Sequence, residues 1–388
     1  MKHLAILGST GSIGTNALSV VKAHPEEFVV SGLAANASVD LMERQVREFR
    51  PQRVALNDKE AALELRRRLV NLNAVEVLSG PEGVLAVATM DAIDLMLDGI
   101  GGSAGLLPTL EAIKARKDIA FVNKEVLVMC GSLVMQAVKD YGVNLLPIDG
   151  EMSAIFQCLS KPQSQNEIQR LLLTASGGPF RQTPAEEFGA ITPQQALQHP
   201  TWKMGKKITI DCATLLNKGL EVIEAKWLFD MNPSQIEILI HPESIIHSMI
   251  EFVDGSLLAQ LSTTDMRIPI QYALTYPRRL PSPTVPLNFP QIGMLHFESV
   301  DFDKFPCLAL AYTAAEVGGT LPTVLSSADE VVVRAFLNEQ IGFTDIPKIL
   351  KAVIDQHDVE PKPSFDHILV ADRWAKSIAR EVISQLSS

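Results

Sequence analysis

Short apolar runs alternate with segments of helical period along the first 148 residues of the chain. Leu41–Phe49 and Ala61–Leu69, for example, repeat their apolar positions with the spacing of an amphipathic helix. This alternation predicts βαβ repetition, and hence a parallel sheet with helices on both faces. The expected strands are Leu4–Leu7, Phe28–Leu33, Arg53–Leu56, Val75–Leu78, Ile93–Leu97, Ile119–Val122 and Asn144–Ile148.

The pattern changes between residues 149 and 275, where strand-like stretches mix with helices. A long segment with glycines and prolines runs there from about residue 176 to 206. Irregular segments of that length inside a compact domain are usually functional loops, so we expect a mobile lid over a binding site. The strand-like stretches are Arg170–Thr174, Lys207–Asp211, Gln235–Ile240 and Leu257–Leu261.

A proline-rich stretch separates this part from a helical C-terminal part. Pro277–Pro290 holds five of the chain's 23 prolines and predicts a stiff linker. We therefore expect an α/β protein of four parts: a Rossmann-like domain (1–148), an α+β domain with a lid (149–275), a linker (276–299) and a C-terminal helical bundle (300–388). Helical patterns follow the linker at Cys307–Val317, Ser326–Gln340, Asp345–Gln356 and Val370–Leu386.

Composition narrows the class of protein. The 388 residues are 47% hydrophobic and 20% charged, as in a soluble globular protein, and no apolar run reaches the roughly 18 residues that span a bilayer. A formal net charge of −11 argues against a nucleic acid or a membrane surface as partner, because both carry negative charge. The four cysteines are scattered without metal-site or disulfide spacing, which is typical of a reducing, cytoplasmic setting.

A glycine turn follows the first expected strand. Leu4–Leu7 runs into G-S-T-G-S-I-G, with glycines at 8, 11 and 14, and a helical stretch follows. Strand, glycine turn and helix are the context of a dinucleotide site, since glycines allow close backbone approach and the helix N-terminus offers free N–H groups. The second strand ends without an acidic residue that would bind a ribose 2′-hydroxyl, which favours NADP over NAD. Asn36 and Ser38 are the available donors there.

Polar residues also stand where two later strands end. Asn123, Lys124 and Glu125 follow the sixth strand, where open parallel sheets bind ligands. Asp149 and Glu151 follow the seventh, and on an extended backbone two residues this far apart share a face. Two neighbouring carboxylates repel unless a cation neutralises them, and oxygen ligands favour Mg²⁺ or Mn²⁺. A D-x-E pair by itself is a weak signal, and a solvated surface pair is the alternative.

Further candidates lie in the second part of the chain. Glu221 offers a third carboxylate, and Asn217 with Lys218 before it suggests an anion site at a helix start. T-A-S-G-G-P-F-R, with Ser176, places small residues and free N–H groups where a phosphate or a simple turn would fit. H-P-T-W-K-M-G-K-K, from His199 to Lys207, puts Trp202 in the expected lid, and a tryptophan on a loop usually closes over something.

Seven motifs together identify a family resemblance. They are G-S-T-G-S-I-G, N-K-E, D-x-E-x-S-A-I-F-Q, T-A-S-G-G-P-F-R, H-P-x-W-x-M-G-K-K-I, N-K-G-L-E-V-I-E-A and H-P-E-S-I-I-H-S-M. In this order and spacing, from residue 4 to about 275, the chain resembles the 1-deoxy-D-xylulose 5-phosphate reductoisomerases, and the resemblance continues more loosely through the helical C-terminus. It implies a homodimer that uses NADPH and one divalent cation, Mg²⁺ or Mn²⁺, and that is inhibited by phosphonohydroxamates.

The resemblance also implies a reaction and a set of site residues. The reaction is the conversion of 1-deoxy-D-xylulose 5-phosphate, a small phosphorylated sugar, to 2-C-methyl-D-erythritol 4-phosphate in the non-mevalonate isoprenoid pathway. The implied metal ligands are Asp149, Glu151 and Glu221, with Lys124 and His199 as further catalytic residues. The implied cofactor contacts are Thr10, Gly11, Ser12, Ile13, Asn36, Asn123, Glu125 and Gly205. The implied substrate contacts are Lys124, Gly150, Glu151, Ser176, His199, Trp202, Cys212, Asn217, Lys218 and Glu221.

Three positions depart from the family pattern. Gly150 and Cys212 stand where the family usually has serine, and Met152 stands where it usually has histidine. We expect activity to survive and phosphorylated ligands to bind more weakly, since a lost hydrogen bond to a charged group costs ~1.5–3 kcal/mol. Three alternatives compete with this interpretation: an NADP-dependent dehydrogenase that needs no metal, a non-catalytic binding protein with the same fold, and a nucleotide-binding protein of unknown use.

Overall fold

The structure is a computed structural model of the chain, and it describes every residue except 73, 160–164, 202–203 and 387–388. The described residues group into two compact units. The first unit comprises Met1–Val126, Val134–Ser153 and Asp265–Val285. The second comprises Leu127–Leu133, Ala154–Thr264 and Pro286–Ser388.

The first unit is built on a seven-stranded parallel sheet with the order β4-β3-β2-β1-β5-β6-β7. The order reverses between β1 and β5, so the switch point at which such sheets bind ligands lies between these two strands. All seven strands expected from the sequence are present, with ends within two residues of the prediction. Their bounds are β1 Lys2–Leu7, β2 Phe28–Ala35, β3 Arg53–Leu56, β4 Glu76–Ser79, β5 Leu95–Asp98, β6 Asp118–Phe121 and β7 Leu145–Pro147.

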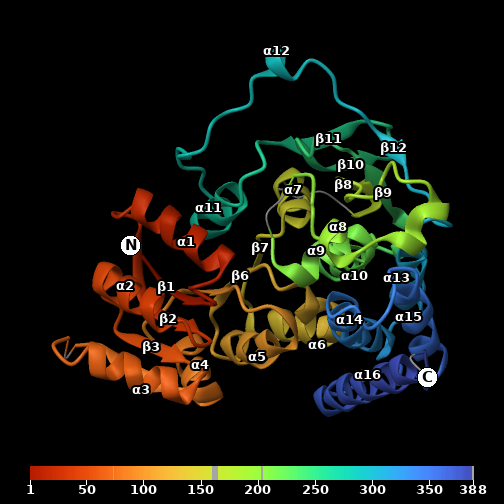
Figure 1. Cartoon of the computed structure of the whole chain (residues 1–388). Coiled ribbons are helices and arrows are strands. Elements are labelled where there is room, and N and C mark those ends of the chain that lie inside the picture. The colour runs from red at the N-terminus through yellow and green to blue at the C-terminus, as the bar shows by residue number, and fades with distance from the viewer. Residues whose placement is uncertain (73, 160–164, 202–203, 387–388) are drawn as a thin grey trace. The chain divides into compact units, whose positions relative to one another are not determined.

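Helices connect these strands, as the sequence predicted (Figure 1). The core strands are almost continuously apolar because both faces of the sheet are covered, and Leu4 to Leu7 are fully buried. A later segment returns to this unit, where Gln271 bonds to His24 at 3.1 Å. The helices are α1 Ser12–Ala23, α2 Val39–Phe49, α3 Lys59–Arg68, α4 Gly80–Ala88, α5 Leu106–Lys114, α6 Lys124–Tyr141 and α11 Arg267–Thr275, with a short 3₁₀ helix at Gly102–Gly105. The helix α6 is kinked at Cys130.

The second unit holds a five-stranded mixed sheet with the order β11-β10-β8-β9-β12. Three of its strands confirm the prediction, whereas β10 and β12 were not expected. The bounds are β8 Ile168–Ala175, β9 Ile236–Ile240, β10 Ile246–Phe252, β11 Leu257–Leu261 and β12 Glu298–Ser299. β8 and β9 run parallel, and β10 is antiparallel to both of its neighbours.

The strand expected at Lys207–Asp211 is wrong, because these residues belong to α9, Lys206–Ala213. The letters K-I-T-I-D alternate as in a strand, but Thr209, Ile210 and Asp211 are all buried. Nζ of Lys207 lies 2.6 Å from Oδ2 of Asp211 one helical turn later, and 2.6 Å from Oδ2 of Asp329. An ion pair between residues four apart stabilises a helix. Burial on all sides of this segment outweighs the strand preference suggested by its alternating apolar residues.

Helices complete the second unit, and the four predicted after the linker are confirmed. They are α13 Pro306–Val317, α14 Leu321–Leu337, α15 Asp345–Asp355 and α16 Phe365–Leu386. Two of them begin five residues earlier than expected. The others are α8 Pro193–Ala196, α10 Leu216–Phe229 and α12 Phe289–Ile292, while α7 Gly150–Cys158 begins in the first unit and ends in the second.

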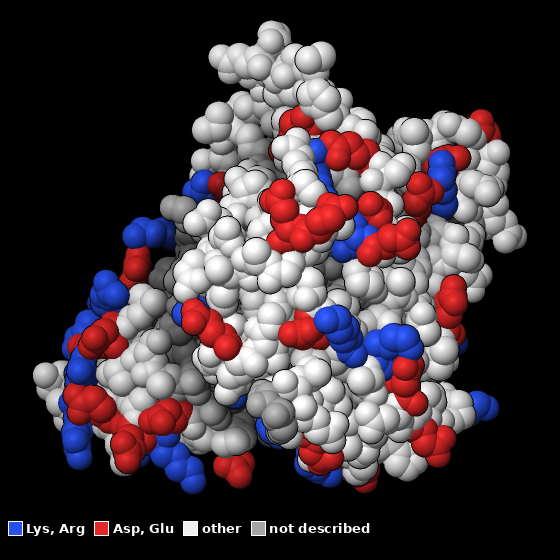
Figure 2. Space-filling model, turned by 45° about the vertical axis from the view of Figure 1, so that its right-hand side comes forward, with Lys and Arg blue, Asp and Glu red and all other residues white. Residues whose placement is uncertain are grey.

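Acidic and basic side chains are interspersed in small groups on the face shown in Figure 2, without a broad basic patch. None of the helices in the described part of the chain is long and apolar enough to cross a membrane.

Candidate active site

The glycine turn lies at the switch point of the first unit's sheet. Gly8 has a φ of 71°, and a Cβ on it would lie 2.3 Å from the carbonyl oxygen of Gly99, which follows β5. A Cβ on Gly14 would lie 2.4 Å from the carbonyl oxygen of Gly8. Strand, turn and helix therefore approach more closely than any other residue type would allow, as in dinucleotide-binding turns.

The N-terminus of α1 is available to an anion. Gly11 is the N-cap residue, no side chain caps the helix, and its first turn contains no acidic residue. Gly11 and Ser12 are exposed, and Thr10 and Ile13 flank them. The first N–H groups of a helix have no partners within it, so these four predicted cofactor residues form a turn that fits a phosphate group.

The other predicted cofactor residues of the first unit follow β2 and β6. Asn36 is exposed just after β2, whereas Asn123 is buried at the N-cap of α6, with Glu125 two residues on. Nδ2 of Asn123 donates to the carbonyl oxygen of Gly102 at 3.1 Å. Its Oδ1 is buried and has no hydrogen-bond partner among the described residues. A buried acceptor of this kind fits an O–H or N–H donor of a bound nucleotide.

Lys124, Asp149 and Glu151 come together at the carboxyl end of the same sheet. Nζ of Lys124 lies 2.7 Å from Oδ2 of Asp149. Each of the two acids offers a carboxylate oxygen within 4.8 Å of the other's. The expected extended backbone is wrong, since Glu151 lies in the first turn of α7. A strand-to-helix turn thus brings the two acids together, and their oxygens fit a hard divalent cation.

Two of the departures from the family pattern lie at this turn. Gly150 is the first residue of α7, and it places no side chain between the two acids. Met152 is completely buried, so it packs in the core and not in the solvent-facing part of the turn.

Ser176 and His199 lie together in the second unit. Ser176 follows β8 directly, and Gly177 and Gly178 after it both have positive φ. Oγ of Ser176 lies 3.2 Å from Nε2 of His199, whose Nδ1 accepts from the N–H of Thr201 at 3.2 Å. Burial lowers the pKa of His199, which favours the neutral ring. With Nδ1 as acceptor, Nε2 carries the proton and donates to Ser176, which leaves the serine hydroxyl to donate to an anion.

Asn217, Lys218 and Glu221 form a second group in this unit, within the first turns of α10. Nδ2 of Asn217 donates to Oε1 of Glu221 at 2.6 Å, and Nζ of Lys218 donates to its Oε2 at 2.5 Å. All three side chains are buried. A Cβ on Gly219 would lie 2.3 Å from Cβ of Ala311, so α10 is held tightly against α13. The group is therefore closely packed, and it places a lysine ammonium directly beside a carboxylate.

The expected lid is described in part. Trp202 lies outside the described residues. Gly205 is the N-cap of α9, and Cys212 lies near that helix's end. A Cβ on Gly178 would lie 2.6 Å from the carbonyl oxygen of Cys212, so α9 contacts the turn that carries Ser176. The pairs of Lys207 with Asp211 and Asp329 anchor the same helix to α14.

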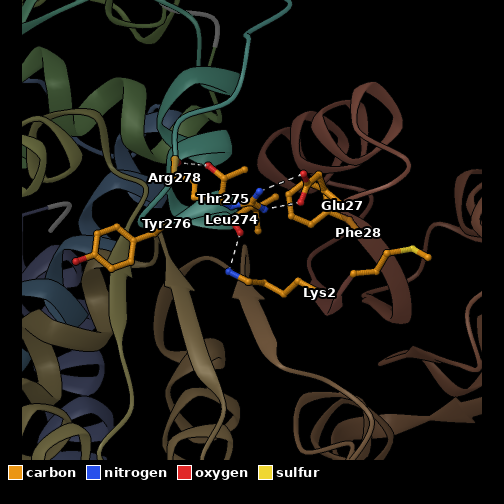
Figure 3. A pocket seen from close by; sticks show the side chains of 8 residues that line it. Lys2, Glu27, Phe28, Leu274, Thr275, Tyr276 and Arg278 are labelled. Carbon is orange, nitrogen blue, oxygen red and sulfur yellow. Dashed lines mark hydrogen bonds and ion pairs between the residues drawn. The ribbon is translucent and has the colours of Figure 1, made fainter.

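A separate pocket of about 190 Å³ lies at the amino ends of β1 and β2, whereas the glycine turn follows the carboxyl end of β1. Figure 3 shows the side chains that line this pocket. Lys2 donates to the carbonyl oxygen of Leu274 at 2.8 Å, and Arg278 pairs with Glu27 at 2.5 Å. Its charged side chains thus already have partners within the pocket, and the pocket contains none of the predicted site residues.

Sequence reasoning missed several buried acids, among them Asp98 and Asp329. Asp98 ends β5 inside an apolar run, and Asp329 lies in the middle of α14. Both could have been recognised as acidic residues at positions where the apolar pattern of a strand or helix predicts burial. A buried acid requires hydrogen-bond or ionic partners.

A parallel sheet with a glycine turn at its switch point and an uncapped helix behind it defines a dinucleotide-binding enzyme fold. Models of the 1-deoxy-D-xylulose 5-phosphate reductoisomerase family match residues 4–131, and those of its two C-terminal domains match 145–229 and 261–378. The chain belongs to this family.

Named relatives and solved structures agree with the family models. A 1-deoxy-D-xylulose 5-phosphate reductoisomerase of Bacillus cereus is 50% identical over 99% of both chains, and one of Prosthecochloris aestuarii is 51% identical over 98% of this chain and 99% of its own. The Zymomonas mobilis enzyme in complex with NADPH superposes with a TM-score of 0.93 at 38% identity, covering 98% of this chain and 99% of its own. A reductoisomerase in complex with NADPH, fosmidomycin and magnesium gives 0.93 at 40% identity over the whole of both chains.

Proposed function

We propose that this chain converts 1-deoxy-D-xylulose 5-phosphate to 2-C-methyl-D-erythritol 4-phosphate, with NADPH and one divalent cation. The observation that carries the proposal is the pair of carboxylates at Asp149 and Glu151, held at the carboxyl end of a dinucleotide-binding sheet in a chain of this family. The metal-independent dehydrogenase has no use for such a pair. The binding-protein alternative leaves both this pair and the buried Lys218–Glu221 pair without a task.

The cation is proposed to bind Asp149, Glu151 and Glu221. When bound, it would supply Lewis-acid polarisation of the substrate's ketone and hydroxyl oxygens. Lys124 lies beside Asp149, and Lys218 lies beside Glu221, so each buried carboxylate has a positive charge next to it. Retro-aldol cleavage with re-addition and a concerted shift both fit these groups.

The substrate phosphate is proposed to bind Ser176, Asn217 and Lys218, with His199 beside them. The hydroxyl of Ser176 and the N–H group of Gly177 would supply donors, and Lys218 would supply charge. Gly150, Trp202 and Cys212 are proposed as further substrate contacts. The segment 176–206 would close as a lid and exclude water, as the chemistry of a charged intermediate requires.

NADPH is proposed to bind the first unit, where it would supply the hydride. Thr10, Gly11, Ser12 and Ile13 would hold its diphosphate, Asn36 would lie on its 2′-phosphate side, and Asn123, Glu125 and Gly205 would be further nucleotide contacts. The sequence boundaries 1–148, 149–275, 276–299 and 300–388 are proposed as the functional division of the chain, and phosphonohydroxamates such as fosmidomycin as its inhibitors.

The protein is also proposed to be a cytoplasmic homodimer. β11 is an edge strand of the second unit's sheet, and Leu257 and Leu258 on it are 51% and 45% exposed. An exposed apolar edge strand is a surface for pairing with another copy. Sedimentation would give a dimer, and Leu258→Asp would shift it to a monomer, with Val317→Asp on α13 as an exposed apolar control.

The first experiment is to follow NADPH oxidation with 1-deoxy-D-xylulose 5-phosphate in Mg²⁺ or Mn²⁺ and again with EDTA. Metal-dependent turnover to 2-C-methyl-D-erythritol 4-phosphate is the expected result. Turnover unchanged by EDTA would favour the metal-independent dehydrogenase, and NADPH binding without turnover would favour the binding protein.

A further inference from the structure

Asp98 is a fully buried acid at the switch point of the first unit's sheet. It is the last residue of β5, which lies between β1 with its glycine turn and β6 with Asn123 at its end. Its carboxylate accepts from the N–H of Ile100 at 3.1 Å and from Oγ1 of Thr109 at 2.9 Å. The side chain of Asn123 donates to it as well. Burial of an acid costs free energy of folding, so we expect Asp98 to have a function at this position.

These contacts determine which way the amide of Asn123 points. Its Nδ2 faces two acceptors, the carbonyl oxygen of Gly102 and the carboxylate of Asp98. The amide nitrogen can satisfy both, whereas the amide oxygen in its place would be repelled by both. Oδ1 is therefore directed away from them, and it is the buried oxygen that has no partner among the described residues.

Close packing holds the arrangement in place. A Cβ on Gly105 would lie 2.2 Å from Nδ2 of Asn123 and 2.8 Å from Oδ2 of Asp98. Gly105 thus leaves just enough room for the two side chains to meet. The free acceptor of Asn123 is consequently held in one position before any ligand arrives, which lowers the ordering cost of binding.

We propose that Asp98 is a positioning residue that orients Asn123, so that Oδ1 of Asn123 accepts a hydrogen bond from an O–H or N–H donor of the bound nicotinamide nucleotide. This inference rests on the proposed function, since it requires that NADPH binds the first unit. Asp98 itself need not touch the nucleotide. Its effect on binding passes through Asn123.

The test is a double-mutant cycle of Asp98→Asn and Asn123→Ala, with the NADPH dissociation constant as readout. It is measured by NADPH fluorescence on the full chain, without substrate or metal. Asn at position 98 has the same shape but presents an N–H₂ group to three donors, so the amide of Asn123 loses its fixed orientation. Each single variant is expected to raise the constant about tenfold, the effect of one hydrogen bond. The double variant is expected to bind no more weakly than Asn123→Ala alone.

Thr109→Val is the matched control, because it removes another partner of Asp98 without touching Asn123. It is expected to lower the melting temperature and to leave the NADPH dissociation constant within about twofold. Circular dichroism establishes that each variant is folded, and Asn123→Ser takes the place of Asn123→Ala in the cycle if the alanine variant does not fold.

The outcomes separate the inference from the proposed function. Additive effects of the two substitutions, or an unchanged constant in Asp98→Asn, overturn the positioning role while wild-type NADPH binding upholds the cofactor assignment. An equal effect of Thr109→Val on binding also overturns it, because it shows a merely structural role. Wild-type protein that binds no NADPH overturns the proposed function and this inference together.

Discussion

Nζ of Lys124 lies 2.7 Å from Oδ2 of Asp149, and the two side chains are only 7% and 12% exposed. In the absence of a cation, the lysine is thus the counter-charge of a carboxylate proposed as a metal ligand. The lysine and the metal ion would then both neutralise Asp149. Removal of one should therefore change how strongly the other stabilises the protein.

Lys124→Gln tests this relationship. We expect the free energy of unfolding to fall by about 3 kcal/mol, because a buried carboxylate loses its partner, and kcat/KM to fall at least ~100-fold. Saturating Mg²⁺ should then raise the melting temperature of the variant more than that of the wild type, since the cation replaces the lost charge. The control is Lys206→Gln, which removes an exposed lysine at the start of α9. An equal response of variant and wild type to Mg²⁺ would contradict the shared role.

Asp149→Asn should weaken binding of the cation. A neutral amide replaces a charged oxygen ligand, and we expect the Mn²⁺ dissociation constant to rise about 100-fold, with activity falling in parallel. Electron paramagnetic resonance of free Mn²⁺ measures this directly. Glu316→Gln on the exposed side of α13 removes one negative charge elsewhere and should leave the constant unchanged. Unaltered Mn²⁺ affinity in Asp149→Asn would remove this residue from the metal site.

Asp98 should make stability depend on pH. Burial raises the pKa of its carboxyl from 3.8 to about 7. Between these values the folded protein holds a proton that the unfolded chain has lost, so this stabilisation is complete below pH 3.8 and is lost as the pH rises through 7. Relative to Asp98→Asn, the wild type should lose roughly 2–3 kcal/mol of unfolding free energy between about pH 5 and pH 8. Urea unfolding at both pH values measures it.

The exposed Asp254 supplies the control for that measurement. Its hydrogen bonds to Ser256 lower its pKa, so it is ionised in both states throughout the same pH range. Asp254→Asn should therefore show no such change relative to the wild type. A pH-independent difference between the wild type and Asp98→Asn would show that Asp98 is already ionised at the lower pH.

Gly14→Ala should disrupt the nucleotide turn. Its Cβ would lie 2.4 Å from both the carbonyl oxygen of Gly8 and Cα of Ser9, so the backbone of the turn must move. We expect a loss of about 3 kcal/mol of stability and at least tenfold weaker NADPH binding. Gly189→Ala, where nothing lies within 4 Å of the added Cβ, should change neither by a measurable amount. Normal NADPH binding in Gly14→Ala would show that the turn does not hold the nucleotide.

Cys212→Ser should strengthen binding of phosphorylated ligands. It restores a hydroxyl that the family usually has, on the helix whose backbone contacts the turn of Ser176. One regained hydrogen bond to a charged group is worth about tenfold in affinity. Calorimetry with fosmidomycin, in the presence of NADPH and Mg²⁺, compares the two proteins. No tighter binding in the serine variant would mean that Cys212 is not a cause of weakened affinity.

The sequence by itself determined the repeating part of this protein. All seven strands of the first unit and the four late helices could be predicted because their apolar periods match their burial, as in Leu4–Leu7 and Cys307–Val317. The glycine turn was equally readable, since glycines at 8 and 14 are required by contacts that no other residue allows. In these segments the local sequence pattern and the tertiary packing favour the same structure, so the pattern alone was enough to predict it.

Tertiary structure decided the places where distant segments meet. The residues around Lys207 alternate as in a strand, yet they form the helix α9. Lys207 pairs there with Asp329, which lies over a hundred residues later in the sequence. Asp98 and Asn123 likewise lie at the ends of two different strands, β5 and β6. No spacing in the sequence shows that one orients the other. Buried polar groups are stabilised by whichever partners the fold brings to them, and those partners are set by packing and not by local period.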